Sequence, residues 1–264
     1  MSDRKRLRGR PKSFHDKSAQ NRIQSLDRAL DVLDCLTKKT GMTQSEIAEY
    51  LDQAPATIYR ILSTFEARRV VEMDPVRQEW FIGSESFRIG SAFLRRTGIV
   101  ERARPYMREL MEETGETANL GVEVSGNVMF ISQVETHANI RAFFPPGANS
   151  PMHASGIGKA LLAHAEPARI EKYIAQKELE NFTPKTISTR DELRDELAKI
   201  KEQGFAFDDE EKSTGMRCIA APVFNVYGEV VAGISISGPS IRLPLERIDQ
   251  VSKIVMAKAA LLSV

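Results

Sequence analysis

The sequence predicts an α+β fold divided into two domains. Three observations support this prediction. The chain has 264 residues, of which 42% are hydrophobic, and at roughly 150 residues per domain this length favours two domains. Apolar residues at helical spacing fill the first part of the chain and end in two short strand patterns. The remainder interleaves strand hairpins with helices, which is typical of a sheet covered by helices.

The first 20 residues differ in composition from the rest of the chain. They contain seven basic and two acidic side chains, and Leu7 is their one large aliphatic residue. Such a segment buries too little apolar surface to offset the entropy of ordering, so we expect a disordered basic tail at 1–20. Residues 1–97 hold 18 basic and 13 acidic groups, whereas the remainder holds 19 and 23. The near-neutral total of +1 therefore hides a basic start and a mildly acidic second part.

Residues 21–84 have the pattern of a winged helix-turn-helix domain. Apolar residues recur at helical spacing over 23–36, 47–51 and 58–65. Thr43 and Glu46 form a capping box before the second helix, and Pro55 suits the first turn of the third. Two short strand patterns flank a turn at 74–78. Three helices and a hairpin within about 60 residues are the plan of this DNA-binding fold.

The spacing of the second and third helices predicts that one braces the other in the major groove of DNA. The predicted DNA contacts of this domain are Thr43, Ala56, Thr57, Tyr59, Arg60, Ser63 and, at the hairpin tip, Arg77. Hydroxyl groups suit phosphates, and Arg60 suits a guanine edge or a phosphate. An ordinary helical pair with a solvated face is the alternative. The hairpin and the basic tail favour DNA.

Within the tail, Arg8 and Arg10 flank Gly9 and precede Pro11, which matches the core of an AT-hook. In that motif the arginines lie in a narrow A·T minor groove, and glycine permits close backbone approach. An unspecific basic arm that releases counterions wherever it binds is an equally good interpretation. Under either interpretation, we expect the tail to strengthen DNA binding.

Residues 85–98 predict a linker helix, and residues 99–264 a second domain. Its helix patterns lie at about 101–114, 155–163, 167–176, 189–203 and 245–262, and its strand patterns at about 117–124, 128–135, 205–208, 219–224 and 230–237. Gly115 and Gly204 are suited to end the helices that they follow. These elements predict an α+β sheet covered by helices.

The densest group of candidate binding residues is the segment 151–160. Ser155 and Gly156 open a helix there, so backbone N–H groups and the positive helix end face outward together and predict a site for a small anion. A phosphate loop is poorly supported, because His153 stands where that motif needs glycine and Ala160 where it needs Ser or Thr. The glycines also fit a second interpretation, in which they only allow tight packing of the helix.

Two further strands carry candidate residues. Ser235 and Ser237 lie two apart, so they share one face and suit a polar ligand, unless both bond to local backbone. Cys218 lies in an apolar stretch and is by default a core residue. Cys218 could be a nucleophile with His153 as its base, but the sequence identifies no third group that would orient the base. Cys218, His153 and Asp208 could also bind zinc together, but they do not have the short spacing of a zinc motif. The acidic run 208–211 is typical of a solvated turn. We therefore predict no catalytic residue, metal or cofactor.

The two cysteines, Cys35 and Cys218, form neither a disulfide framework nor a metal clip, which fits a reducing compartment. The basic start is not followed by the apolar run of a signal peptide, and no stretch approaches the roughly 20 apolar residues of a membrane span. We therefore expect a cytoplasmic protein that has no membrane partner.

Seven short motifs occur in a specific order along the chain. They are SLDRAL at 25–30, TIYRIL at 57–62, FRIG at 87–90, MHASGIGKA at 152–160, GFAFDDEE at 204–211, GMRCIAAP at 215–222 and ISISGP at 234–239. With them the chain resembles the IclR family of bacterial transcriptional regulators from about Ile23 onward. It departs from the family in one turn, where Asp52 and Gln53 replace glycine and an apolar residue and Ala56 replaces a common serine. Aspartate tolerates this turn conformation, so the fold is kept, but operator contacts do not transfer.

The resemblance implies a winged helix domain and a GAF-like effector-binding domain. It also implies that the protein binds a palindromic double-stranded DNA operator as a dimer or as a dimer of dimers, which is a homotetramer. In family members that sense glyoxylate or pyruvate, the acid is held by positions that match Ser155, Gly156, Ile157, Asp208, Cys218, Ser235 and Ser237. The resemblance favours the branch that responds to glyoxylate, including regulators of the β-hydroxyaspartate cycle.

Other functions fit parts of the sequence. Pyruvate or an aromatic acid, in place of glyoxylate, is an alternative effector for such a regulator. An enzyme that acts on a 2-oxo acid through Cys218 is disfavoured, because no acid and base stand at an interpretable spacing. A purely structural DNA-binding protein is disfavoured by the glycine-rich helix start and the pair of serines.

Overall fold

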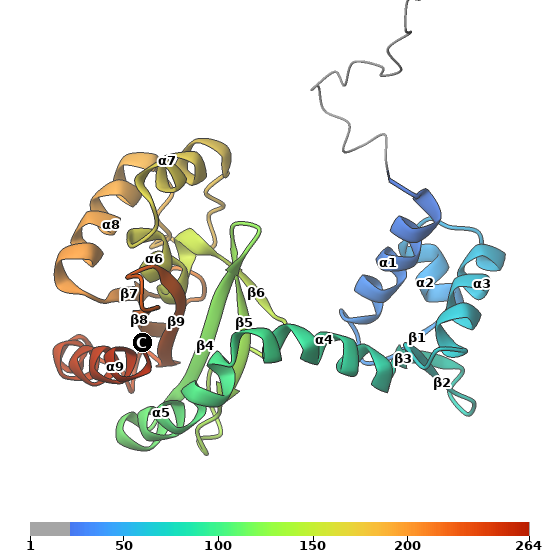
Figure 1. Ribbon diagram of the computed structural model, residues 1–264, viewed down its shortest axis with the longest axis horizontal. Helices are drawn as coiled ribbons and strands as arrows, with labels where there is room; N and C mark the ends of the chain where they lie inside the picture. The colour runs from blue at the N-terminus through green and yellow to red at the C-terminus, as the bar shows by residue number, and fades with distance from the viewer. Residues whose placement is uncertain (1–21, 264) are drawn as a thin grey trace, which may run out of the picture. The chain divides into compact units, whose positions relative to one another are not determined.

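The computed structural model describes residues 22–263, and the chain divides into two compact units (Figure 1). The first unit ends at Phe93 and the second begins at Leu94. The predictions of a disordered tail at 1–20 and of DNA contacts by Arg8 and Arg10 lie outside the described residues.

The first unit is a winged helix-turn-helix, as predicted. It contains α1 (Gln24–Leu36), α2 (Gln44–Tyr50), α3 (Pro55–Glu66) and a sheet of β1 (Met42–Thr43), β3 (Glu79–Ile82) and β2 (Val71–Asp74) in that order. Val32, Ile47, Ile58, Leu62 and Trp80 meet in its core. The capping box before α2 is present, because Thr43 accepts from the backbone of Glu46 while the Glu46 carboxylate accepts from that of Thr43.

Two features of this unit differ from the sequence pattern. β1 was not predicted, because two residues are too few to show alternation; Met42 pairs with Trp80 of β3. The apolar stripe of α1 is also only partly covered. Val32 and Leu36 are buried, but Leu26 and Leu30 are 59% and 62% exposed. Hydrophobic spacing therefore located the helix without showing how much of its apolar face the unit buries.

The helix α4 (Ser84–Thr97) follows the wing, close to the predicted linker at 85–98. The boundary between the two units falls inside this helix. Within the described part of the chain, no helix is long and apolar enough to cross a membrane.

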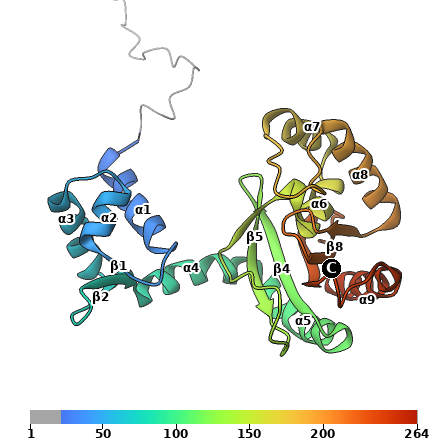
Figure 2. The same ribbon diagram turned by 180° about the vertical axis from the view of Figure 1, so that it is seen from behind.

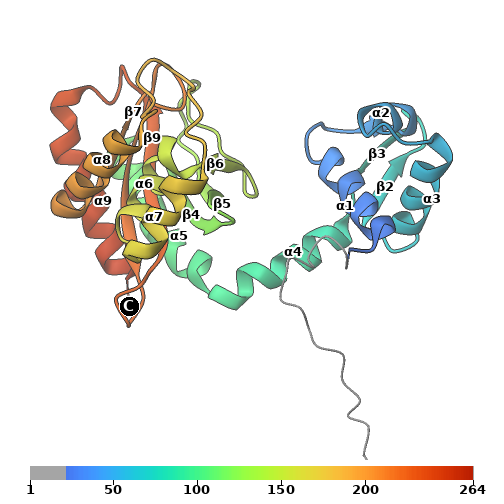
Figure 3. The same ribbon diagram turned by 90° about the horizontal axis from the view of Figure 1, so that it is seen from above.

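The second unit is built on a six-stranded antiparallel sheet in the order β6-β5-β4-β9-β8-β7. Figure 2 shows β5 and β4 side by side in this sheet. The strands are β4 (Thr117–Val124), β5 (Asn127–Val134), β6 (Asn149–Pro151), β7 (Ala206–Asp209), β8 (Met216–Phe224) and β9 (Val230–Pro239). The helices α5 (Ile99–Thr114) and α9 (Ile248–Leu262) cover one face, and α6 (Gly156–Ala163) packs on the other, against α8 (Arg190–Gln203) (Figure 3). The predicted α+β class is confirmed.

Element ends in this unit follow the predicted stop signals. Gly115 and Gly204 end α5 and α8 with φ values of 75° and 82°, the left-handed region in which glycine replaces a strained side chain. α7 (Pro167–Gln176) matches its prediction. The short edge strand β6 and the 3-10 turn at Met152–Ala154 were not predicted, and the turn at Leu245–Arg247 precedes α9 where one continuous helix was expected.

Candidate functional site

The predicted DNA contacts in the first unit gather on α3 and the wing. Ala56, Tyr59 and Arg60 are exposed, and Thr57 and Ser63 are partly buried. The guanidinium of Arg60 forms no salt bridge with any described residue, so its charge is available to a partner. Arg28 of α1, which the sequence analysis did not single out, lines a groove together with Thr57 and Arg60.

Two other predicted contacts are shaped by local hydrogen bonds. The hydroxyl of Thr43 donates to Glu46 Oε2 over 2.9 Å, so this side chain serves the N-cap of α2. At the wing tip, Asp74 Oδ1 accepts from the backbone N–H groups of Val76 and Arg77 at 2.8 and 3.2 Å. These bonds fix the turn from which the exposed Arg77 projects.

In the second unit, a small cavity of about 30 Å³ lies at the start of α6. It is lined by Phe130, Phe144, Ser150, Ala154, Ser155, Gly156, Ile157, Asp208, Lys212, Cys218 and Ser237. Six of the seven residues predicted to hold an effector therefore come together here from α6, β7, β8 and β9. The seventh, Ser235, lies on the same face of β9, two residues from Ser237.

The glycine-rich start of α6 is explained by its contact with the sheet. Ser155 caps the helix by accepting from the backbone N–H of Gly158 at 3.3 Å. A Cβ on Gly156 would lie 2.8 Å from Cys218 Sγ, and a Cβ on Gly158 would overlap the backbone of Met152. These glycines therefore allow α6 to pack tightly. The first N–H groups of the helix, at Gly156 and Ile157, still have no carbonyl within the helix and can meet an anion.

A row of polar side chains crosses the sheet beneath α6. In the strand register, Asp208 lies opposite Cys218, and Cys218 opposite Ser237. Asn119 of β4 continues the row by donating to Ser237 Oγ over 3.2 Å, and Gln133 of β5 donates to Asn119 Oδ1 over 3.0 Å.

The hydroxyl of Ser235 is an exception within this row. It is fully buried and forms no hydrogen bond with a nitrogen or oxygen atom of the described residues, and the thiol of Cys218 is a neighbour of it. A buried hydroxyl without a partner costs free energy, so a ligand that reached it would relieve that cost.

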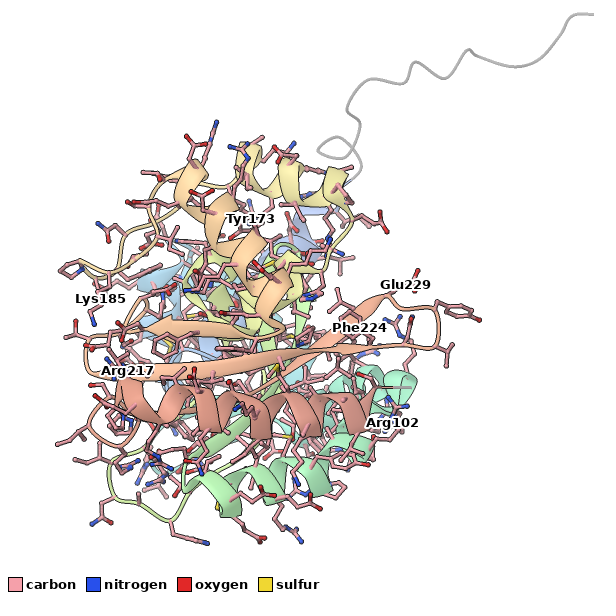
Figure 4. All side chains as sticks on the ribbon, turned by 90° about the vertical axis from the view of Figure 1, so that its left-hand side faces the viewer. Arg102, Tyr173, Lys185, Arg217, Phe224 and Glu229 are labelled. Atoms are coloured by element: carbon pink, nitrogen blue, oxygen red, sulfur yellow. The ribbon has the colours of Figure 1, made fainter. Side chains whose placement is uncertain are left out.

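The sequence predicts a solvated turn at the acidic run 208–211, and this prediction is wrong. Asp208 and Glu211 are buried, at 8% and 6% exposure. Asp208 Oδ1 accepts from the backbone N–H of Glu211 at 2.8 Å, and burial raises the pKa of Asp208 to about 6. Asp209 and Glu210 are less buried, and both pair with Lys185. Asp209 also pairs with Arg217. Figure 4 labels Lys185 and Arg217.

Glu211 belongs to a buried ionic cluster that sequence reasoning missed. Lys159 of α6 is fully buried, and its Nζ donates to Glu211 Oε1 at 2.5 Å, to Glu196 Oε1 at 2.9 Å and to the carbonyl of Phe207 at 2.7 Å. Burial raises the pKa of Glu211 to about 7, although the lysine opposes that shift. The cluster therefore connects α6, whose first residues line the cavity, with α8 and with the end of β7.

The chemistry of Cys218 does not suit a nucleophile. Burial raises the pKa of its thiol to about 11, and the neighbouring hydroxyls of Ser237 and Ser235 oppose that shift only in part. Such a thiol carries very little thiolate at neutral pH. His153 is buried elsewhere, with Nε2 2.9 Å from the carbonyl oxygen of Glu180. Over the described residues, no three His, Cys, Asp or Glu side chains are arranged to hold a metal ion.

A wider hollow of about 280 Å³ lies between α7 and the turn of the β4–β5 hairpin. Its basic lining residues include Arg169, which pairs with Glu123, and Lys177, which donates to the carbonyl of Ser125 at 3.5 Å. The hollow also lacks an unpartnered buried polar atom. We therefore place the candidate ligand site at the smaller cavity, where a helix start and buried hydroxyls converge.

The raised pKa of Asp208 predicts a pH dependence of stability. The folded chain keeps this proton up to about pH 6, whereas the ordinary pKa is 3.8. Lowering the pH from 7 to 4.5 should therefore stabilise the wild type, relative to Asp208→Asn, by about 2 kcal/mol in the free energy of unfolding. Urea denaturation across this pH range measures the difference.

The neighbouring residue provides a control of opposite sign. Burial of Asp209 is outweighed by its hydrogen bonds to Lys185 and Arg217, which hold the pKa of its carboxyl below the usual value. Relative to Asp209→Asn, the wild type should therefore lose stability as the pH falls. Parallel pH profiles for the wild type and Asp208→Asn would show that Asp208 titrates normally.

The first unit has the fold of a DNA-binding domain, and the second contains a small cavity at a helix start. These two features define the class of DNA-binding transcriptional regulators with a ligand-binding domain. The family follows from comparison with known proteins. The IclR helix-turn-helix domain matches residues 25–75, and the bacterial transcriptional regulator IclR C-terminal domain matches residues 91–264. The chain belongs to the IclR family, and its relatives are transcriptional regulators rather than enzymes.

Particular relatives cover nearly the whole chain. It is 50% identical over 266 residues to the HTH-type transcriptional regulator BhcR of Paracoccus denitrificans (strain Pd 1222), covering 100% of this chain and 95% of that protein. It is 34% identical over 255 residues to the transcriptional repressor IclR of Escherichia coli (strain K12), covering 96% and 93%. The crystal structure of the Thermotoga maritima IclR matches with a TM-score of 0.76 at 29% identity, covering 90% and 97%.

A further solved structure shares the fold at lower identity. It is an IclR homolog from Microbacterium hydrocarbonoxydans complexed with 4-hydroxybenzoate, with a TM-score of 0.80 and 23% identity, covering 90% of this chain and 97% of that one. At this identity the likeness concerns the fold alone.

Proposed function

We propose that a small 2-oxo acid, with glyoxylate as first choice and pyruvate as second, binds in the cavity at the start of α6 and changes the affinity of this regulator for its operator. The observation that carries the proposal is the convergence of two free helix N–H groups with the hydroxyl of Ser237 at the cavity. Next to Ser237 on the same face of β9, the buried hydroxyl of Ser235 has no partner of its own among the described residues. Such a set suits the carboxylate and carbonyl oxygens of a compact acid.

The size of the cavity favours a compact ligand over an aromatic acid. A volume of about 30 Å³ corresponds to one or two water molecules. A two-carbon acid requires little widening, whereas a benzoate ring would have to displace the stacked rings of Phe130 and Phe144, whose centroids lie 4.7 Å apart. An effector such as the 4-hydroxybenzoate of the Microbacterium protein is therefore disfavoured here.

Asp208 has a specific role in this proposal. Its carboxylate is turned toward backbone N–H groups, so it does not oppose the ligand carboxylate directly. The carbonyl end of the acid, or the hydroxyl groups of its hydrate, would lie toward Asp208 and Cys218. The carboxylate end would then meet the N–H groups of Gly156 and Ile157.

The first unit supplies the operator contacts in this proposal. We infer that Ala56, Thr57, Tyr59, Arg60 and Ser63 enter the major groove, with Thr43 and Arg77 at the flanking backbone. Arg8 and Arg10 add sequence-tolerant attraction. Self-association as a dimer or a dimer of dimers would cover the exposed side chains of Ile23, Leu26 and Leu30, and two-fold symmetry would match a palindromic operator in the cytoplasm.

Calorimetric titration with glyoxylate and with pyruvate tests the ligand site. Replacing both serines, Ser235→Ala with Ser237→Ala, should weaken binding at least about tenfold, because each lost hydrogen bond to a charged group is worth about 1.5–3 kcal/mol. Ser132→Ala serves as the control, since this buried serine is on β5 and does not line the cavity. Equal affinities for the double variant and the wild type would remove the serines from the site.

A further inference from the structure

Lys212 is the one cationic side chain among the residues that line the cavity, and Asp208 is the one anionic side chain. Sequence reasoning did not single out Lys212, because it follows an acidic run and resembles a surface lysine. In the fold it is partly buried and lines the cavity.

The backbone that carries Lys212 is held in place from two sides. The carboxylate of Asp208 accepts from the backbone N–H groups of Glu211 and Lys212. From the other side, Thr183 Oγ1 donates to the carbonyl of Glu210 at 2.8 Å, and Thr186 Oγ1 donates to that of Glu211 at 2.6 Å. These hydrogen bonds fix the backbone position of Lys212 at the cavity.

The ammonium group of Lys212 lacks a carboxylate partner. It lies 3.2 Å from the ring centroid of Phe182, and the salt bridges of the described residues do not include it. Lys159, by contrast, has three oxygen partners. Burial lowers the pKa of Lys212, and the negative charge of Glu180 opposes that shift. An aromatic face compensates a partly desolvated ammonium less fully than an anion does.

We propose that Lys212 is the charge-recognition residue of the pocket, and that its ammonium pairs with the carboxylate of the bound 2-oxo acid. This inference rests on the proposed function and adds the property that sets the ligand class. The N–H groups of α6 and the serine hydroxyls can also bond to the oxygen atoms of a neutral ligand, whereas the full positive charge of Lys212 favours a carboxylate strongly over an amide. The pocket should therefore bind 2-oxo acids much more tightly than their uncharged amides.

The test compares each acid with its amide, glyoxylate with glyoxylamide and pyruvate with pyruvamide, by calorimetry on the full chain. Lys212→Met keeps the length of the side chain and removes its charge. It should weaken binding of the acids about 10-fold or more and change binding of the amides less than about 3-fold, because a charge-assisted hydrogen bond is lost with the acids alone. Lys199→Met, at an exposed position on α8, removes the same charge away from the cavity and should change neither.

Thermal unfolding of each variant shows whether the fold is intact. If Lys212→Met binds the acids as tightly as the wild type, or weakens acids and amides equally, Lys212 does not read the charge and this inference is overturned while the proposed ligand class stands. If the wild type binds neither acid, both this inference and the proposed function are overturned.

Discussion

Replacing Lys159 by methionine is expected to lower the free energy of unfolding by about 3–5 kcal/mol. Methionine fills nearly the same volume but leaves two carboxylates, Glu211 and Glu196, and the carbonyl of Phe207 without their shared donor. One oxygen of Glu211, Oε2, already has no partner among the described residues. Urea denaturation at pH 7 measures the loss.

Two further variants separate the buried cluster from a general effect of charge. Lys185→Met also removes a lysine that bridges two carboxylates, but this lysine is 47% exposed, so we expect a loss of at most about 1 kcal/mol. Combining Lys159→Met with Glu211→Gln should recover part of the loss, because a neutral amide tolerates burial better than an unpaired carboxylate. A loss below about 1 kcal/mol for Lys159→Met would contradict the role assigned to the cluster.

Gly156→Ala is expected to weaken binding of glyoxylate by about 10- to 100-fold. The added methyl carbon would lie 2.8 Å from Cys218 Sγ and 3.4 Å from Ala220 Cβ, so Cys218 or the start of α6, both of which line the cavity, must shift. Overpacking at such a site costs about 1–3 kcal/mol, and a ligand that occupies the same space adds to that cost. Calorimetry gives the affinity, and thermal unfolding shows that the variant is folded.

Gly90→Ala is the matched control for this substitution. Gly90 lies in a helix, and a Cβ at this position meets no atom within 4 Å. The control should bind glyoxylate normally and unfold at the same temperature as the wild type or slightly higher, because alanine favours helix. Wild-type affinity for Gly156→Ala would place the ligand outside the cavity.

Local signals in the sequence predicted much of the fold because they act over a few residues. The capping box of Thr43 and Glu46 and the glycines after α5 and α8 satisfy backbone groups in their own turn, so their effect does not depend on the rest of the chain. The candidate pocket was predicted in the same way for Ser155 and Gly156. The serines of β9 were found from their spacing, since alternate residues of a strand share a face.

The parts that were missed depend on long-range packing. Lys159 stands four residues after Ser155, in the segment that was compared with a phosphate loop, and nothing near it in the sequence indicates burial. Its carboxylate partners come from α8 and from the segment after β7. The acidic run 208–211 has the composition of a surface turn, and only the packing of α6 on the sheet shows that Asp208 and Glu211 are buried. Asn119 gave no signal because its partner, Ser237, is 118 residues away.

The most direct test of the proposed function is operator binding as a function of glyoxylate concentration. Fluorescence anisotropy with labelled DNA from upstream of this protein's gene and of the adjacent genes measures the affinity at constant salt. We predict that glyoxylate changes the dissociation constant of the wild type at least about 5-fold, and that the chain with Ser235→Ala and Ser237→Ala binds DNA normally but does not respond. A wild-type affinity that stays constant up to millimolar glyoxylate would contradict it.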